Sequence, residues 1–136
     1  MYLIGLFLMM ASDYQKTTTL AKRKGKLSLN KGLISTGFFA RTRNPNYFGE
    51  TLIYLAFSAC TGHWISYAIQ IIVQVPLFYE NMTKKDRDSY SKKEGWDEYK
   101  KKSYMFLPKI FPTDIINYVF YALLAGSLLY LYINSQ

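Results

Sequence analysis

The amino-acid sequence predicts an all-α integral membrane protein with a short helical hairpin, an interfacial helix and one C-terminal transmembrane helix. Half of the 136 residues are hydrophobic, although the mean hydropathy of −0.05 alone would suggest a soluble protein. That average hides a segregation, because the apolar residues form blocks and the Lys and Arg residues lie between them. The last block, 115–133, is uncharged and has the length of about 20 residues that a bilayer requires.

The earlier apolar blocks predict a half-span followed by a hairpin. Residues 1–11 are too few to cross a bilayer, so they form half a span at best. Residues 47–60 and 64–79 are separated only by the polar break at 61–63, which favours a tight turn between two antiparallel helices.

The polar segment 84–102 predicts a helix that lies on the membrane surface. Trp96, Tyr99 and Met105 recur at roughly helical spacing, as expected for side chains that face the lipid headgroups.

Two prolines, Pro108 and Pro112, break the chain before the last apolar block. The sequence therefore predicts a domain in residues 1–112 and an added C-terminal transmembrane helix in 113–136.

The net charge of +8 is concentrated in two basic segments, 16–43 and 83–109. A hairpin between them would place both on one side of a membrane, and the positive-inside rule makes that side the cytosol or the mitochondrial matrix. We expect no nucleic-acid partner, since no binding motif is present. A single Cys60 and a single His63 predict no disulfide and no metal site.

The segment around Pro45 predicts an anion site. The residue before a proline is disfavoured in a helix and proline suits the first helical position, so a helix should begin at Pro45. Its free N–H groups would lie beside Arg41 and Arg43, and this arrangement could bind the headgroup of an anionic phospholipid. Alternatively, both arginines are ordinary membrane anchors.

Three polar side chains follow on one face of this helix, because Asn46, Tyr47 and Glu50 are three or four residues apart. A carboxylate within a membrane helix is costly, which makes Glu50 a functional candidate. Its alternative role is that of an ion-pair partner of the nearby arginines.

The stretch from Arg43 to Gly49 resembles the motif of the steroid 5-alpha-reductase C-terminal family, which is Arg, His or Asn, Pro, Asn or Ser, Tyr, any residue, Gly. Other pieces of the chain fit the same family in order, and the resemblance spans roughly residues 13–111. These pieces are Asp13-x-Gln15-Lys16, Asn81-Met82-x-x-Lys85-Asp86, Gly95-Trp96-x-x-Tyr99, Ser103 and Leu107-Pro108-Lys109-Ile110-Phe111.

The resemblance implies a cofactor site but does not identify the reaction. Sterol and steroid reductases of this superfamily use NADPH, and its isoprenylcysteine carboxyl methyltransferases use S-adenosylmethionine. The residues that would line the site are Arg43, Asn44, Pro45, Asn46, Tyr47, Gly49 and Glu50, closed by Lys85, Asp86, Trp96 and Tyr99. The alternative for the last two aromatic residues is a membrane belt.

Two departures from the family favour an accessory, non-catalytic subunit of a large membrane protein complex. Before Asp13 the only apolar stretch is 1–11, where family enzymes have several helices, and an extra helix with Ala122-x-x-x-Gly126 follows the family's usual end. Partner proteins would contact 1–11 and 115–133. We expect the mitochondrial inner membrane, with the endoplasmic reticulum as the alternative. An NADPH- or S-adenosylmethionine-dependent enzyme and a lipid-binding module remain open.

Overall fold

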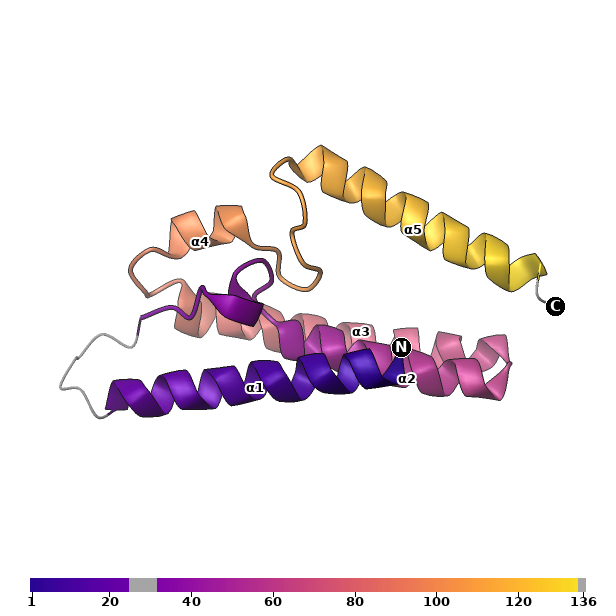
Figure 1. Cartoon of the computed structure of the whole chain (residues 1–136), viewed down its shortest axis with the longest axis horizontal. Helices are drawn as coiled ribbons and strands as arrows, with labels where there is room; N and C mark the ends of the chain where they lie inside the picture. Colours follow the sequence, from indigo (N-terminus) through magenta and orange to yellow (C-terminus); the bar gives the residue numbers. More distant parts are fainter. Residues whose placement is uncertain (25–31, 135–136) are drawn as a thin grey trace.

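The computed structural model describes residues 1–24 and 32–134, and these are largely helical (Figure 1). The elements in chain order are α1 (Tyr2–Lys24), the 3₁₀ turn η1 (Gly37–Phe39), α2 (Pro45–Thr61), α3 (Trp64–Lys85), the π-helical turn η2 (Asp86–Tyr90), α4 (Trp96–Lys102) and α5 (Asp114–Asn134). No strand occurs in the described ranges, where Thr42 and Tyr104 form an isolated bridge. The part of the predicted basic segment at 25–31 lies outside the described residues.

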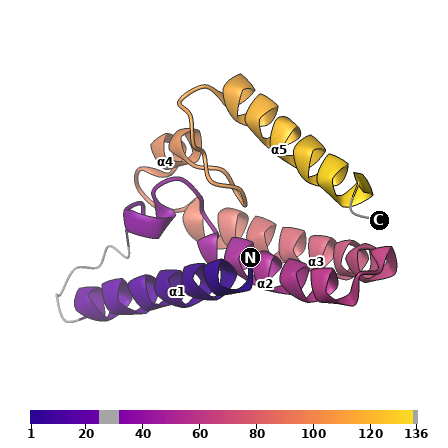
Figure 2. The same cartoon turned by 45° about the vertical axis from the view of Figure 1, so that its right-hand side comes forward.

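Helices α1, α2 and α3 form the body of the molecule (Figure 1). Helix α4 and the segment before α2 lie at one end of this body, and α5 follows on a long connection. In both views α5 stands apart from the three-helix body (Figure 2). The arrangement therefore leaves α5 as an arm joined to the rest through residues 103–113.

The predicted hairpin is confirmed. Gly62 ends α2 with φ of +63°, a left-handed conformation that favours glycine. His63 then caps α3, because its imidazole accepts a hydrogen bond from the Ile65 N–H at 3.3 Å. The break at 61–63 thus reverses the chain within two residues. The predicted helix start at Pro45 is also confirmed.

Two glycines allow α1 and α2 to touch backbone to backbone. A Cβ placed on Gly49 would lie 2.6 Å from the Gly5 carbonyl oxygen and 2.7 Å from the Met9 nitrogen. A Cβ on Gly5 would lie 2.6 Å from the Gly49 carbonyl oxygen. Only glycine permits so close an approach. Gly49, expected to line a cofactor site, therefore lies in a helix crossing.

The prediction of an integral membrane protein is wrong. Within the described residues, no helix combines the length and the apolar character that a membrane crossing needs. Helix α2 has 17 residues, α1 becomes polar after Ala11, and the first turns of α5 contain Asp114 and Asn117. The predicted half-span is instead the first half of a 23-residue helix. The positive-inside rule applies to loops that flank membrane spans, so the predicted orientation of the two basic segments no longer follows from it.

The predicted interfacial helix is also corrected. Residues 84–102 contain the end of α3, the π-helical turn and the seven-residue α4, so they form no single helix. Met105 lies beyond α4 in the connection to α5. Tyr99 is buried against protein rather than against headgroups.

The interior is unusually polar for so apolar a chain. The largest fully buried side chains are Asn44, Asn117, Ser12 and Ser103. By contrast, many large apolar side chains are exposed, including Leu3 at 75% and Leu123 at 69%. Hydrogen bonds between side chains and backbone therefore hold much of the interior, and apolar surface is left outside.

Candidate functional site

Arg43 is the centre of the predicted site, and the structure uses it as an internal connector. The side chain is buried, with Nη1 donating to the Ser103 carbonyl at 3.1 Å and Nε 3.1 Å from Asp86 Oδ2. The backbone N–H of Arg43 donates to the Tyr104 carbonyl at 2.9 Å. This set, with the Trp96 ring 5.4 Å from the guanidinium carbon, is called the Arg43 clasp below.

The Arg43 clasp binds three elements together, namely the start of α2, the π-helical turn and the end of α4. Burial raises the pKa of the Asp86 carboxyl, and the cations of Arg43 and Lys100 offset only part of this effect. Desolvation is therefore the dominant cause of the shift in this pKa. A buried pair of this kind stabilises poorly on balance but is costly to break.

Two more predicted site residues have structural bonds. Asn44 is 1% exposed, and its Nδ2 donates to the Met105 carbonyl at 2.9 Å. The Tyr99 hydroxyl donates to the Phe39 carbonyl at 2.7 Å, and burial raises the pKa of Tyr99. Both side chains therefore hold the segment before α2 against α4 and its following loop.

A second group of predicted site residues meets between helices α1, α2 and α3. The Lys85 ammonium lies 4.3 Å from the centre of the Tyr47 ring, which itself stacks on Phe78 at 4.7 Å. Burial lowers the pKa of Lys85, opposed by the charge of Asp13. Burial and the negative charge of Glu50 raise the pKa of Tyr47. Helices α1, α2 and α3 thus bring together a group that we name the Tyr47 cluster, which consists of Asp13, Tyr47, Glu50, Phe78 and Lys85.

The predicted pairing of Arg41 with Arg43 at one anion site is not what the structure shows. Arg41 is exposed and turns toward the connection before α5, where its Nη1 donates to the Ile110 carbonyl at 2.7 Å. Arg43 is buried in its clasp. Asn46 is half-buried at the second position of α2.

Two buried oxygen atoms near the Arg43 clasp have no hydrogen-bond partner, namely Asp86 Oδ1 and Thr83 Oγ1. Buried polar atoms are normally satisfied, so such atoms are places where a ligand group can bind. Both atoms belong to residues within two positions of Lys85, whose ammonium contacts the Tyr47 ring. A ribose hydroxyl or an adenine amino group has the chemistry to donate to them. Within the described residues, no three His, Cys, Asp or Glu side chains could hold a metal ion.

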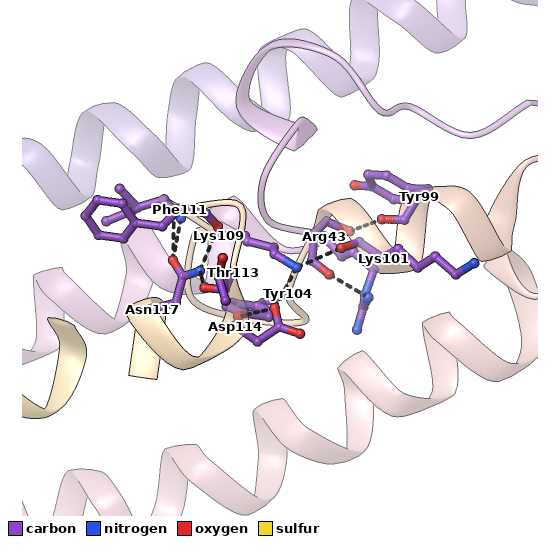
Figure 3. A network of polar contacts seen from close by, with 11 residues as sticks. Arg43, Tyr99, Lys101, Tyr104, Lys109, Phe111, Thr113, Asp114 and Asn117 are labelled. Carbon is purple, nitrogen blue, oxygen red and sulfur yellow. Dashed lines mark hydrogen bonds and ion pairs between the residues drawn. The ribbon is translucent and has the colours of Figure 1, made fainter. Parts of the chain in front are cut away.

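Sequence reasoning missed the polar anchor of α5. Asn117 is fully buried and makes four bonds, accepting from the Ile110 and Phe111 N–H groups and donating to the Phe111 and Thr113 carbonyls at 2.7–2.9 Å (Figure 3). The Tyr121 hydroxyl also donates to the Pro108 carbonyl. One signal was available, since an asparagine within an otherwise apolar run requires a partner.

Residues 1–103, about three quarters of the chain, match the model of a family described as "Protein of unknown function (DUF1295)". The chain belongs to this family, which is steroid 5-alpha-reductase-like. No similar protein was found among curated proteins or among solved structures.

Proposed function

We propose that this chain is a small, non-catalytic accessory subunit of a large membrane protein complex. The observation that carries the proposal is the internal use of the family motif. Arg43, Asn44 and Tyr99 are each bonded to backbone carbonyls of the same chain. Side chains that are buried and bonded to the backbone in this way stabilise a scaffold, which supports a structural role for the motif.

Exposed apolar side chains on two helices support the same proposal. Helix α1 exposes Leu3, Ile4 and Phe7 by more than half, and α5 does the same with Leu123 and Leu129. Contiguous apolar surface on a protein is typical of an interaction site. The partner contacts that we expect at 1–11 and 115–133 would use these surfaces. The mitochondrial inner membrane, with the endoplasmic reticulum as the alternative, stays the predicted location.

The test is a native-gel comparison of tagged chains expressed in their source cells. We expect the wild-type chain to migrate in a large assembly, and Leu123→Glu to release it by placing a charge in the contact. Asn134→Glu, which adds the same charge at the exposed end of α5, is the matched control. A wild-type chain that migrates alone contradicts the proposal.

We propose an enzyme as the second candidate, because of the unpartnered Asp86 and Thr83 oxygens beside Lys85 and Tyr47. Within the steroid-reductase-like group, the motif from Arg43 to Gly49 relates the chain to the sterol reductases and the isoprenylcysteine carboxyl methyltransferases. The first would use NADPH and the second S-adenosylmethionine. Asp86 and Thr83 would accept from hydroxyl or amino groups of either molecule.

Calorimetric titration separates the two functions. Binding of NADPH or of S-adenosylmethionine that is lost in Thr83→Val would favour the enzyme. No heat with either molecule, together with migration in a large assembly, would favour the accessory subunit.

A further inference from the structure

A basic pocket lies between the segment before α2, the end of α4 and the connection to α5. Its volume is about 420 Å³. Its walls are Ala40, Arg41, Lys101, Lys102, Lys109, Ile110, Phe111 and Pro112. Four of these eight residues are cations and none is acidic. The sequence predicted an anion site at Arg41 together with Arg43, whereas this Arg41 pocket joins Arg41 to lysines that are far away in the chain.

Hydrogen bonds hold the walls of the Arg41 pocket in place. The Arg41 carbonyl accepts from the Lys109 N–H at 2.8 Å and from the Tyr104 N–H at 3.3 Å. The Arg41 Nη1 donates to the Ile110 carbonyl at 2.7 Å, which holds the guanidinium across the pocket. The Lys109 Nζ donates to the Lys101 carbonyl at 2.9 Å. The pocket is therefore preformed, which lowers the entropic cost of binding.

Three of the four cations are available to a ligand. Lys109 lies 2.5 Å from Asp114 Oδ1, so its charge is neutralised within the chain. Arg41 uses an N–H of Nη1 to bond the Ile110 carbonyl. A guanidinium has five N–H donors, so others remain for a ligand. Lys101 and Lys102 are exposed at the end of α4. A helix C-terminus alone favours lysines, but it does not explain why Arg41 converges on them from another segment.

We propose that the Arg41 pocket binds a phosphate group carried on an apolar molecule. The phosphate would lie between Arg41, Lys101 and Lys102, because a guanidinium and two ammonium groups match its charge and its several acceptor oxygens. The apolar part would rest on Ile110, Phe111 and Pro112. An anionic phospholipid has this combination, and so does a soluble phosphate ester of an apolar alcohol. The inference is independent of the proposed function, since it uses neither partner surfaces nor the Tyr47 cluster.

The first arm of the test is co-sedimentation with vesicles. Wild-type chain is compared on phosphatidylcholine vesicles with and without phosphatidylglycerol. The test variant is Lys101→Gln with Lys102→Gln, and the control is Lys92→Gln with Lys100→Gln, which removes the same charge outside the pocket. All four lysines are exposed, so both variants should fold, as circular dichroism would check.

We expect the test variant to lose about 30-fold in affinity for phosphatidylglycerol vesicles, since each basic residue near an anionic surface contributes about 1 kcal/mol. The control should lose only a few-fold. Equal losses in the two variants would overturn the proposal, because they would reflect net charge alone.

The second arm is titration with inorganic phosphate, followed by the amide resonances of Lys101 and Lys102. Shifts that saturate and disappear in the test variant support the phosphate site and indicate that a soluble ester suffices. Shifts absent with phosphate but vesicle binding that depends on the pocket indicate a lipid source. Absence of both responses overturns the inference.

Discussion

Helices α1 and α5 are attached to the molecule in opposite ways. Helix α1 packs against α2, and the two backbones meet at Gly5 and Gly49. Helix α5 is held at one end by the buried amide of Asn117, and a Cβ added to Gly126, near the middle of the helix, would meet no atom within 4 Å. Close packing makes α1 part of the body, whereas hydrogen bonds make α5 a projecting arm.

Two features decide how each helix is attached, namely a glycine at a crossing in α1 and a buried amide in α5. Glycine at a crossing allows dispersion contacts over a long stretch, which are individually weak and collectively strong. A buried amide gives direction and a defined attachment but covers little apolar area. The surface of α5 therefore stays available for partners, as the exposure of Ile115, Leu123 and Ile133 indicates. The experiments below test the two attachments against each other.

Substitution of Gly49 by valine should have the largest effect. The new side chain would meet the Gly5 carbonyl oxygen and the Met9 nitrogen, which belong to the backbone of α1 and have little freedom to move. We expect a loss of about 3 kcal/mol in the free energy of unfolding, from overpacking at the crossing. Thermal melts by circular dichroism would show a midpoint lower by roughly 10 °C. Gly126→Val is the matched control, and an equal loss there would contradict the packing explanation.

Substitution of Asn117 by alanine should come next. It leaves the Ile110 and Phe111 N–H groups and the Phe111 carbonyl without this partner, whereas the Thr113 carbonyl keeps the backbone N–H of residue 117. We expect a cost of about 2 kcal/mol, felt locally, because α5 can detach while α1 and α2 stay packed. Hydrogen exchange should accelerate at Ile110 and Phe111. Asn134→Ala removes only an exposed bond to the Tyr130 carbonyl and should change little.

Substitution of Gly126 by alanine should act in the opposite direction. The position has open space around it, so the added methyl group meets nothing. Alanine favours an exposed helix interior over glycine by about 1 kcal/mol at most. We therefore expect a slightly higher midpoint and slower amide exchange within α5. A loss of stability would show that α5 packs closely at Gly126 in solution.

The smallest effect should be the pH dependence of the Asp114 contacts. Hydrogen bonds from Lys109 and from the Tyr104 hydroxyl lower the pKa of the Asp114 carboxyl. The unfolded chain therefore binds this proton more tightly, and the stabilisation is complete above the ordinary pKa and lost as pH falls through the folded-state pKa. The first turn of α5 should be more stable in wild type than in Asp114→Asn at about pH 6, and equally stable at about pH 2.5. Amide exchange in this turn measures the difference, and a difference that persists in acid would exclude the carboxylate as its source.

The same two regions show how far sequence patterns lead. The hairpin was predictable because its determinants are local. Gly62 ends α2 through its own backbone conformation, and His63 caps the first turn of α3. The start of α2 at Pro45 was predictable for the same reason. The polar second half of α1 was missed, since no apolar pattern marks it and its contacts are with the segment before α2, where Gln15 donates to the Thr36 carbonyl and accepts from the Phe38 N–H. The apolar blocks were interpreted as membrane spans because only their composition is visible in the sequence. The structure shows that such a block can be one part of a longer helix whose other part is polar.

The candidate site was predictable only in part. Tyr47 and Glu50 share a helix face, as the spacing required, and Lys85 does come close to Tyr47. The pairing of Arg43 with Asp86 joins residues on separate elements, and the sequence offered no sign that the arginine would be buried. Arg41, two residues away, faces a different pocket altogether.

The sequence by itself determined the helix boundaries at Pro45 and Gly62, together with the motif that places the chain in its family. These features depend on backbone chemistry within a few residues. Only the tertiary structure decided that the motif side chains bond to their own chain, that Arg41 meets Lys101 and Lys102, and that α5 projects from the body. Contacts between distant residues depend on the geometry of packing, because a hydrogen bond or an ion pair requires two groups within about 3–4 Å and sequence separation does not report that distance.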